Sequence, residues 1–400
     1  MYRIIFKSFF CVLLIITLFS NIIDNIIGID IVKFFDEFLL FLSIFSIVLY
    51  FFIKLKFPDY FKNVFLVFIS LLFISFLSPI FTKESVFQIF IHLKFFLFFI
   101  FIRIFFKRDN YILKYTFYFI IFLTLLGLFL NLIFKEEFNY FLDYDIRYRN
   151  GLLRMIGFQV SPNNLGLTFM LIYLYAIFYN NKKSFLFLHI STVLFIIVNL
   201  LIGIRTSLIL IPIVYFLFTK KLYSGFLKYF TYFSLAILFS FLIFSSQNTD
   251  IFKRTVNNII DTQNLNSGYA RGLIMLNALK LSVTNFPIGS GSATYGTMLS
   301  KESPIYKQLN INANGNLPIY DSNFSSILGE FGFLGILLFI YLIVSLNKIL
   351  KHETKIPYYY LSLIITIFIF SITNPVLMNG YQALLLAVVF NLYQNNISSK

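Results

Sequence analysis

The sequence predicts an all-α polytopic membrane protein, from its composition and from the length of its apolar runs. Hydrophobic residues make up 59% of the 400 residues and charged residues only 12%, against about 25% charged residues in soluble domains. This small number of polar residues cannot cover the surface of a large core. Lipid must therefore be the solvent for most of the surface. We expect a single integral membrane domain over residues 1–400, with about 12 transmembrane helices.

Apolar runs of helix length define these expected spans. A helix over 185–218 would be roughly 50 Å long, too long for one crossing, so we divide it at Gly203-Ile204-Arg205 and expect a turn below the membrane surface. The runs fall at about 4–23, 34–53, 63–81, 86–106, 112–134, 164–179, 185–203, 204–218, 226–244, 324–346, 358–374 and 380–393.

The distribution of charge predicts the orientation of the spans. With both termini in the cytoplasm, most Lys and Arg residues and few acidic residues lie on the cytoplasmic side, so the whole net charge of +15 lies there. Arg3 and Lys7 precede the first apolar run without a small-residue cleavage site, which indicates a retained span and not a signal peptide. Nucleic-acid binding needs a clustered basic face, and the sequence contains none, so we expect no nucleic-acid partner.

Two loops on the extracytoplasmic side are longer than the other connections. The first covers 135–163, and the second, large loop covers 245–323 and includes an amphipathic stretch from Tyr269 to Val283. Loops of this length are uncommon unless they are functional or disordered. We therefore expect the chemistry of the protein at this side of the membrane.

The first loop ends in a run that suits an anion. Ser161 is a favourable N-cap and Pro162 a favourable first helical residue, so the next helix is expected to begin there. The free N–H groups of such a helix end favour phosphates, and Arg154 adds a bidentate donor, with Asn163 in the first turn. The alternative is a capped span with an interfacial arginine.

Two further arginines are candidates. An arginine at the bilayer centre costs roughly 2.5–3.5 kcal/mol, so Arg205 needs a water-filled cavity or an anionic partner, unless it reaches the outer headgroups. Arg271 lies on the amphipathic stretch, ahead of a segment with Gly289 and Gly291. These glycines permit a tight turn or a close approach to a ligand, or they are ordinary loop glycines.

The large loop closes with two acidic candidates. Asp321 or Ser322 is suited to cap the following helix, which places Glu330 about 12 Å along it. A carboxylate at that depth is usually functional or paired. The alternative for Glu330 is a structural pairing with a buried Arg or with Lys94.

Nucleotide and metal motifs are not expected to contribute. The ATP-binding pattern G-x-x-x-x-G-K-[ST] is absent. Asp143 and Asp145 resemble the Asp-x-Asp pair of metal-dependent glycosyltransferases, but they face away from the cytoplasmic nucleotide sugars, so we interpret them as a solvated loop. The three histidines lie far apart in the sequence and give no zinc pattern. We expect neither a cofactor nor a metal.

Together these motifs resemble the bacterial O-antigen polymerase and O-antigen ligase superfamily. The matching features are R-x-x-G-x-x-x-x-P-N from Arg154 to Asn163, the G-x-R-T-S turn at Arg205, and the large loop with N-F-P-I-G-S-G and the closing D-S-N…G-E-F-G-F-L-G. They cover about 150–335. The resemblance implies a metal-independent glycosyltransferase of the bacterial inner membrane, which transfers glycan from a polyprenyl-pyrophosphate carrier on the outer face.

The ligase branch usually has a histidine near the end of the large loop, where this chain has Asp321-Ser322-Asn323. This difference favours a polymerase that joins polyprenyl-pyrophosphate-linked oligosaccharide repeat units into O-antigen or capsule-like chains, with a chain-length regulator as a further partner. The alternatives are an O-antigen ligase with a lipid or protein acceptor, and a lipid-linked oligosaccharide flippase or transporter. Transporters often have repeated halves and broken helices, and neither is evident in the sequence.

The chemistry of this reaction assigns roles to the candidates. Breaking the anomeric bond releases a doubly charged pyrophosphate, so Arg154, Arg205 and Arg271 are expected to bind it. The acceptor hydroxyl needs a base. Asp321 is the first candidate for that base and Glu330 the second.

Overall fold

The computed structural model describes residues 2–27, 34–106 apart from 56 and 59, 110–179 apart from 145, 147, 150, 151 and 160, 185–222, 271–309, 311, 320, 322–352 and 357–392. These residues are helical or in turns, apart from a short antiparallel pair, β1 (Tyr148–Arg149) and β2 (Leu152–Leu153). The helices are α1 Tyr2–Leu18, α2 Ser20–Ile27, α3 Phe35–Lys54, α4 Phe61–Leu77, α5 Glu84–His92, α6 Lys94–Phe106, α7 Asn110–Phe141, α8 Pro162–Tyr179, α9 Phe185–Ile202, α10 Arg205–Leu222, α13 Arg271–Thr284, α14 Pro304–Gln308, α15 Asn323–His352, α16 Pro357–Thr373 and α17 Gly380–Leu392.

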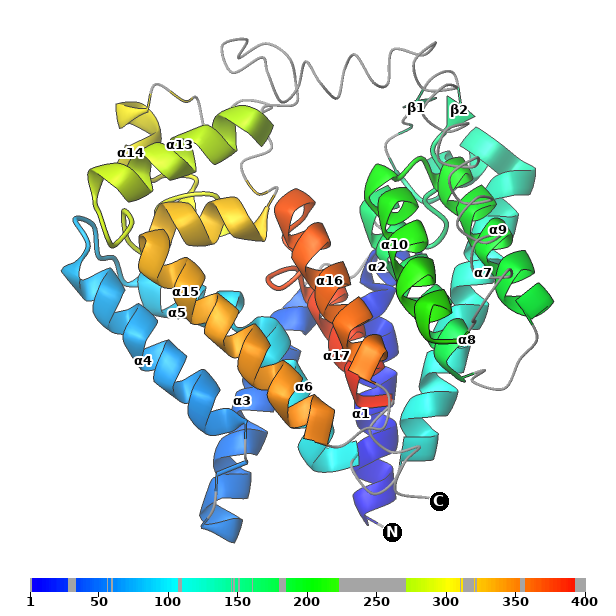
Figure 1. Cartoon of the computed structure of the whole chain (residues 1–400), viewed down its shortest axis with the longest axis horizontal. Helices are drawn as coiled ribbons and strands as arrows, with labels where there is room; N and C mark the ends of the chain where they lie inside the picture. Colours follow the sequence, from blue (N-terminus) through cyan, green and yellow to red (C-terminus); the bar gives the residue numbers. More distant parts are fainter. Residues whose placement is uncertain are drawn as a thin grey trace.

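Helix α17 lies at the centre of the bundle (Figure 1). All 13 of its residues are buried, and it packs against α1, α3, α6, α7 and α8. Its sequence is apolar on every side, as expected of a helix without an exposed face. The amide nitrogen of Asn391 donates to the carbonyl oxygens of Phe99 (3.2 Å) and Ala387 (2.8 Å), so this polar residue is accommodated inside the core.

The outer helices expose apolar side chains instead of charged ones. Phe52 on α3, Phe73 on α4 and Phe122 on α7 are 66%, 61% and 58% exposed. Among the described residues, three helical stretches are long and apolar enough to cross a membrane, namely Phe35–Lys54, Tyr111–Phe141 and Asn323–Leu350, and α5 with α6 adds a fourth if the bent pair is one span. The structure therefore supports a helical membrane protein, and the larger number of spans stays a prediction.

Most of the expected apolar runs that lie in the described residues are helices. The division of 185–218 is confirmed, because α9 ends at Ile202 and α10 begins at Arg205. Within the large loop, most of the stretch noted from Tyr269 to Val283 lies in a helix, α13. The run at 226–244 and the first part of the large loop, 245–270, lie outside the described residues.

Two breaks were not expected from the sequence, and a third, at Lys135, lies where the span 112–134 was expected to end. The run 86–106 is not one helix, because α5 and α6 meet at an angle of 59°. Lys135 interrupts α7 (φ 48°, ψ −116°), and Gly332 interrupts α15 (φ 63°, ψ −155°). The expectation that the chain has no broken helices is therefore wrong. Apolar residues dominate the sequence around the α5–α6 bend and around Gly332, so hydropathy alone does not reveal those two breaks.

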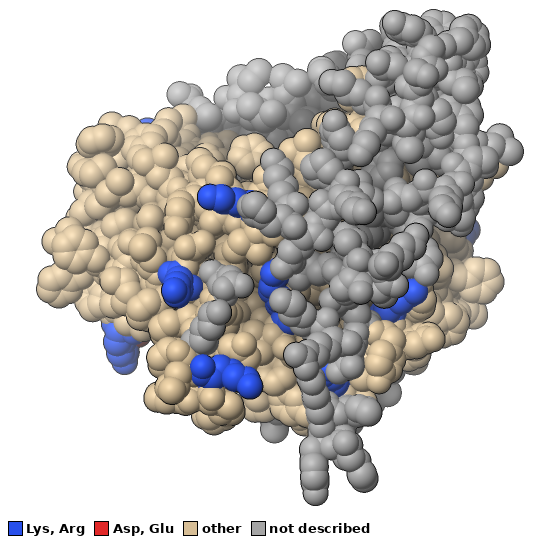
Figure 2. All heavy atoms as spheres, turned by 60° about the horizontal axis from the view of Figure 1, so that its bottom comes forward, with Lys and Arg blue, Asp and Glu red and all other residues tan. Residues whose placement is uncertain are grey.

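The two ends of the bundle differ in charge. One end, which we name the basic end, carries lysines and arginines near the termini of successive helices, and no acidic side chain among the residues described there (Figure 2). Acidic side chains of the described residues, such as Glu84, Glu137 and Glu302, lie toward the opposite end, which also carries β1, β2, α13 and α14 (Figure 1). The residues of the basic end are Lys7, Lys54, Lys62, Arg103, Lys114 and Lys348.

This charge asymmetry predicts that exposed residues of the two ends lie on opposite sides of the membrane. The single cysteine, Cys11, is buried, so Cys11→Ser gives a background without thiols. In that background, we expect Lys301→Cys to react with an impermeant maleimide in intact spheroplasts. Lys62→Cys should react only after permeabilisation. Equal labelling of both positions in intact spheroplasts would contradict the arrangement.

Candidate functional site

The break in α15 is stabilised by the segment that follows α13. A helix interrupted at Gly332 leaves carbonyl groups without their usual partners four residues on. The backbone N–H groups of Ser290 and Gly291 donate to the carbonyl oxygens of Gly329 and Glu330, both at 2.9 Å. In return, the N–H of Leu334 donates to the carbonyl oxygen of Pro287 at 3.3 Å. The two backbones therefore pair directly.

Glycines on both sides make this close contact sterically possible. A Cβ at Gly332 would lie 2.6 Å from the carbonyl oxygen of Pro287, and a Cβ at Gly289 would lie 2.5 Å from the carbonyl carbon of Glu330. Both distances are shorter than side-chain contacts allow. The two glycine-rich motifs found in the sequence are thus complementary halves of one backbone contact, and their glycines have a structural reason.

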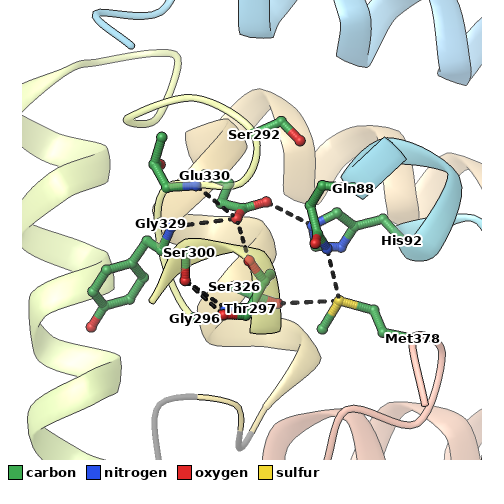
Figure 3. A network of polar contacts seen from close by, with 12 residues as sticks. Gln88, His92, Ser292, Gly296, Thr297, Ser300, Ser326, Gly329, Glu330 and Met378 are labelled. Carbon is green, nitrogen blue, oxygen red and sulfur yellow. Dashed lines mark hydrogen bonds and ion pairs between the residues drawn. The ribbon is translucent and has the colours of Figure 1, made fainter. Parts of the chain in front are cut away.

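Glu330 is the centre of a buried polar network beside this break (Figure 3). Its Oε1 accepts hydrogen bonds from the N–H groups of Thr294 (3.1 Å) and Tyr295 (3.3 Å) and from Thr297 Oγ1 (3.0 Å). Its Oε2 lies 2.7 Å from His92 Nε2, and both side chains are fully buried. One carboxylate therefore joins α15, the end of α5 and the turn at 294–297.

Gln88 and Ser326, one helical turn before His92 and Glu330, make contacts toward α17. The His92 ring packs edge-on against Phe331, with 5.2 Å between ring centroids. Gln88 and Ser326 both reach the sulfur of Met378, at 3.9 and 3.8 Å, and Met378 lies just before α17 (Figure 3). The polar network thus connects both broken helices to the start of the central helix.

A tyrosine closes the network on the side of α14. Tyr306 accepts a hydrogen bond from the N–H of Gly296 (2.7 Å), and its hydroxyl lies 2.8 Å from Ser300 Oγ. Burial raises the pKa of Tyr306 to about 12, so the hydroxyl stays protonated at neutral pH. The turn at 294–300 is therefore fixed from two directions, by a carboxylate and by a neutral phenol.

The partner of Glu330 differs from the alternatives considered from the sequence. Glu330 pairs with His92 and not with Lys94 or with a buried arginine. Lys94 instead lies 2.9 Å from Asp36 and 3.8 Å from Glu37, at the start of α3. Since both carboxylate oxygens of Glu330 are in hydrogen bonds and none of the side chain is exposed, the geometry assigns it a positioning role and not that of a base.

A second polar group lies where α8, α10, α15 and α17 begin, and we name it the helix junction. Four contacts link the helix ends: Asn164 with Gln382 (2.8 Å), Thr168 with Tyr381 (2.6 Å), Ser207 with the carbonyl oxygen of Gly166 (3.3 Å), and Thr206 with Thr373 (3.2 Å).

The start of α15 joins the same junction. The N–H of Leu377 donates to Asn323 Oδ1 at 2.8 Å, and the N–H of Asn323 donates to the carbonyl oxygen of Asn374 at 3.4 Å. Four N-terminal ends with their partly positive dipoles therefore meet at one level of the bundle.

Three side chains cap these helices. Ser161 accepts from the N–H of Asn164 (3.3 Å), Ser322 from that of Ser325 (3.3 Å), and Asn379 from that of Gln382 (3.1 Å). The caps expected at Ser161 and Ser322 are confirmed. Each cap takes up one of the first four N–H groups of its helix, so other first-turn N–H groups remain without helical acceptors.

The structure brings three of the expected binding residues to the junction. Asn163 is half-buried in the first turn of α8, and Arg205 is the first residue of α10. Arg154 is half-buried, and its neighbour Met155 shares an apolar cluster with Ile204. The side chain of Arg205 is not described.

The remaining candidates lie elsewhere. Arg271 begins α13, which packs on α15 near the Glu330 network, and the side chain of Arg271 is not described. Asp321, between Tyr320 and Ser322, lies outside the described residues. A comparison with models of known protein families finds no match, and a comparison with curated proteins finds none either.

Sequence reasoning did not single out several polar residues of these two groups. His92, Gln88 and Gln382 each lie inside an apolar run, and Gln159 lies within the first loop. A polar residue isolated in an apolar run is itself a signal, because burying it without partners is unfavourable. Which partner it takes across more than 200 residues of chain cannot be read from one sequence.

We predict that Glu330→Ala destabilises the protein by about 3–5 kcal/mol, because it leaves His92 and three buried donors without their acceptor. Glu330→Gln keeps an acceptor for these donors and should lose less. Glu302→Ala, at an exposed position of the same loop, is the matched control and should melt like the wild type. Thermal unfolding in detergent measures the difference. A wild-type melting curve for Glu330→Ala would contradict the positioning role.

Proposed function

We propose that the protein is a membrane glycosyltransferase of the O-antigen polymerase type. It joins polyprenyl-pyrophosphate-linked repeat units into O-antigen or capsule-like chains on the outer face of the bacterial inner membrane. The observation that supports this proposal best is the helix junction. It places four helix N-termini, with linked amide and hydroxyl side chains, at one end of an apolar bundle.

The junction suits a diphosphate head group for electrostatic reasons. A helix N-terminus offers N–H donors and a partial positive charge to an anion. Arg154 and Arg205 belong to the segments that meet there and supply full positive charge. During transfer, negative charge grows on the leaving pyrophosphate, and fixed donors that face it lower the barrier.

The surroundings of the junction suit a lipid substrate. The exposed side chains of the outer helices are largely Phe, Leu and Ile, so a prenyl chain can lie along them while its head group reaches the junction. The basic end lies opposite the junction, and the positive-inside rule therefore places the junction outside the cytoplasm. In this orientation the chain crosses the membrane about 12 times, and both of its termini face the cytoplasm.

A base for the acceptor hydroxyl remains part of the proposal. Asp321 is the first candidate, since its neighbour Ser322 caps α15 at the junction. Glu330 is withdrawn from this role because its carboxylate is buried and its oxygens are taken up by the turn at 294–297 and by His92. It instead fixes the segment of the large loop that packs on α15.

Glycan ladders from complemented deletion cells test the assignment. At matched protein levels, Arg154→Ala, Arg205→Ala and Asp321→Ala should each lower polymerisation at least about 100-fold, because each removes a group that acts on the transition state. Lys301→Ala, an exposed basic residue at the same end of the bundle, is the control and should leave the ladder unchanged. Normal long-chain product from all three test variants would refute the roles.

A lipid-linked oligosaccharide transporter is the second candidate, and one observation favours it. Two broken helices meet at the buried His92–Glu330 pair, and buried His–carboxylate pairs at broken helices also occur in proton-coupled transporters. Deletion of the gene separates the two functions. Without a polymerase, single repeat units still reach the outer surface, whereas without a transporter they accumulate inside. Accumulation inside would replace the glycosyltransferase proposal by the transporter.

A further inference from the structure

Two glutamines at the helix junction have amide atoms without hydrogen-bond partners in the described part of the chain. Gln159 is fully buried beside the hydroxyl of Tyr381, and neither its nitrogen nor its oxygen forms a hydrogen bond of full geometry. Gln382 is 2% exposed, and its carbonyl oxygen also has no partner. Leaving buried polar atoms unpaired costs about 1–3 kcal/mol each, so this concentration of them at one place calls for a reason.

Both amides are held against the first turn of α8. The nitrogen of Gln382 donates to Asn164 Oδ1 at 2.8 Å, which fixes its free carbonyl oxygen beside the helix start. Gln159 lies two residues before Ser161, the residue that caps α8. Arg154, which we assign to binding of the pyrophosphate, lies at the other end of the short segment that leads to Ser161. The glutamines thus lie next to the expected position of the first sugar.

The chemistry of the unpaired atoms selects the kind of ligand. A phosphate oxygen only accepts hydrogen bonds, so it would leave the Gln159 and Gln382 carbonyl oxygens unsatisfied. A sugar hydroxyl both donates and accepts, and it satisfies either end of an amide. Neutral amides that surround a helix start therefore fit the hydroxyl-bearing part of the lipid better than its charged part.

We propose that Gln159 and Gln382 form a carbohydrate subsite, which binds hydroxyl groups of the pyrophosphate-linked sugar while Arg154 and the helix N-termini bind the diphosphate. This inference rests on the proposed function and adds the residues that distinguish a glycan-bearing lipid from a bare one. Since both side chains are buried, sugar entry requires the segment from Arg154 to Ser161 to move outward, which is a local opening that the ligand stabilises.

Binding to two lipids tests the subsite. The purified protein in nanodiscs is titrated with undecaprenyl pyrophosphate and with the undecaprenyl-pyrophosphate-linked repeat unit extracted from cells that lack the gene. The wild type should bind the glycan-bearing lipid more tightly. Gln159→Met and Gln382→Met should each weaken binding of that lipid about tenfold and leave binding of the bare lipid unchanged, because hydrogen bonds to the sugar are lost.

Gln88→Met is the matched control. Gln88 is also a buried glutamine with an unpaired carbonyl oxygen, but it lies beside His92 and not at the junction. Its replacement should leave the affinity for both lipids unchanged. Gln159→Met should also melt close to the wild type, since the amide that it removes forms no hydrogen bond of full geometry in the described structure. Weakened binding at the wild-type melting temperature therefore reports on the subsite and not on folding.

The other outcomes overturn the inference in distinguishable ways. Unchanged affinity of both glutamine variants for the glycan-bearing lipid would mean that the amides bind only buried water. An equal loss for both lipids would assign the glutamines to the diphosphate or to the fold. If the wild type binds neither lipid, the proposed function fails as well, and the subsite fails with it.

Discussion

The carboxylate of Glu330 is the interaction on which the arrangement around α15 depends. It accepts three hydrogen bonds from the turn at 294–297 and pairs with His92. Without it, the backbone of that turn would face a buried apolar environment with unsatisfied donors, which is strongly unfavourable. Because the same residue lies two positions before the break at Gly332, the network also fixes where α15 bends and thereby where its first turn points.

The Glu330 network and the helix junction are parts of one continuous polar layer. Met378 contacts Gln88 and Ser326 on one side, and the preceding residue, Leu377, donates to Asn323 on the other. The 287–300 segment, α15 and the start of α17 therefore belong to one packed region.

The sequence predicts the helices and several of their ends well, because apolar runs, caps and prolines are local features. Ser161 and Ser322 are recognisable as caps from their immediate neighbours. The break at Gly332 is not, since apolar residues continue on both sides and the reason for the bend is a partner segment some 40 residues earlier. The same holds for His92 and Glu330, which are 238 residues apart. Such pairs follow from tertiary packing, and a single sequence does not show which distant residues will pair.

The central position of α17 has a consequence for the order in which the protein is assembled. Every helix that it touches in the core, α1, α3, α6, α7 and α8, precedes it in the chain. During synthesis these helices are therefore made before the helix that they surround, so they cannot reach their final packing until α17 is present. The bond between Asn164 and Gln382 is among the contacts that form only at this last step.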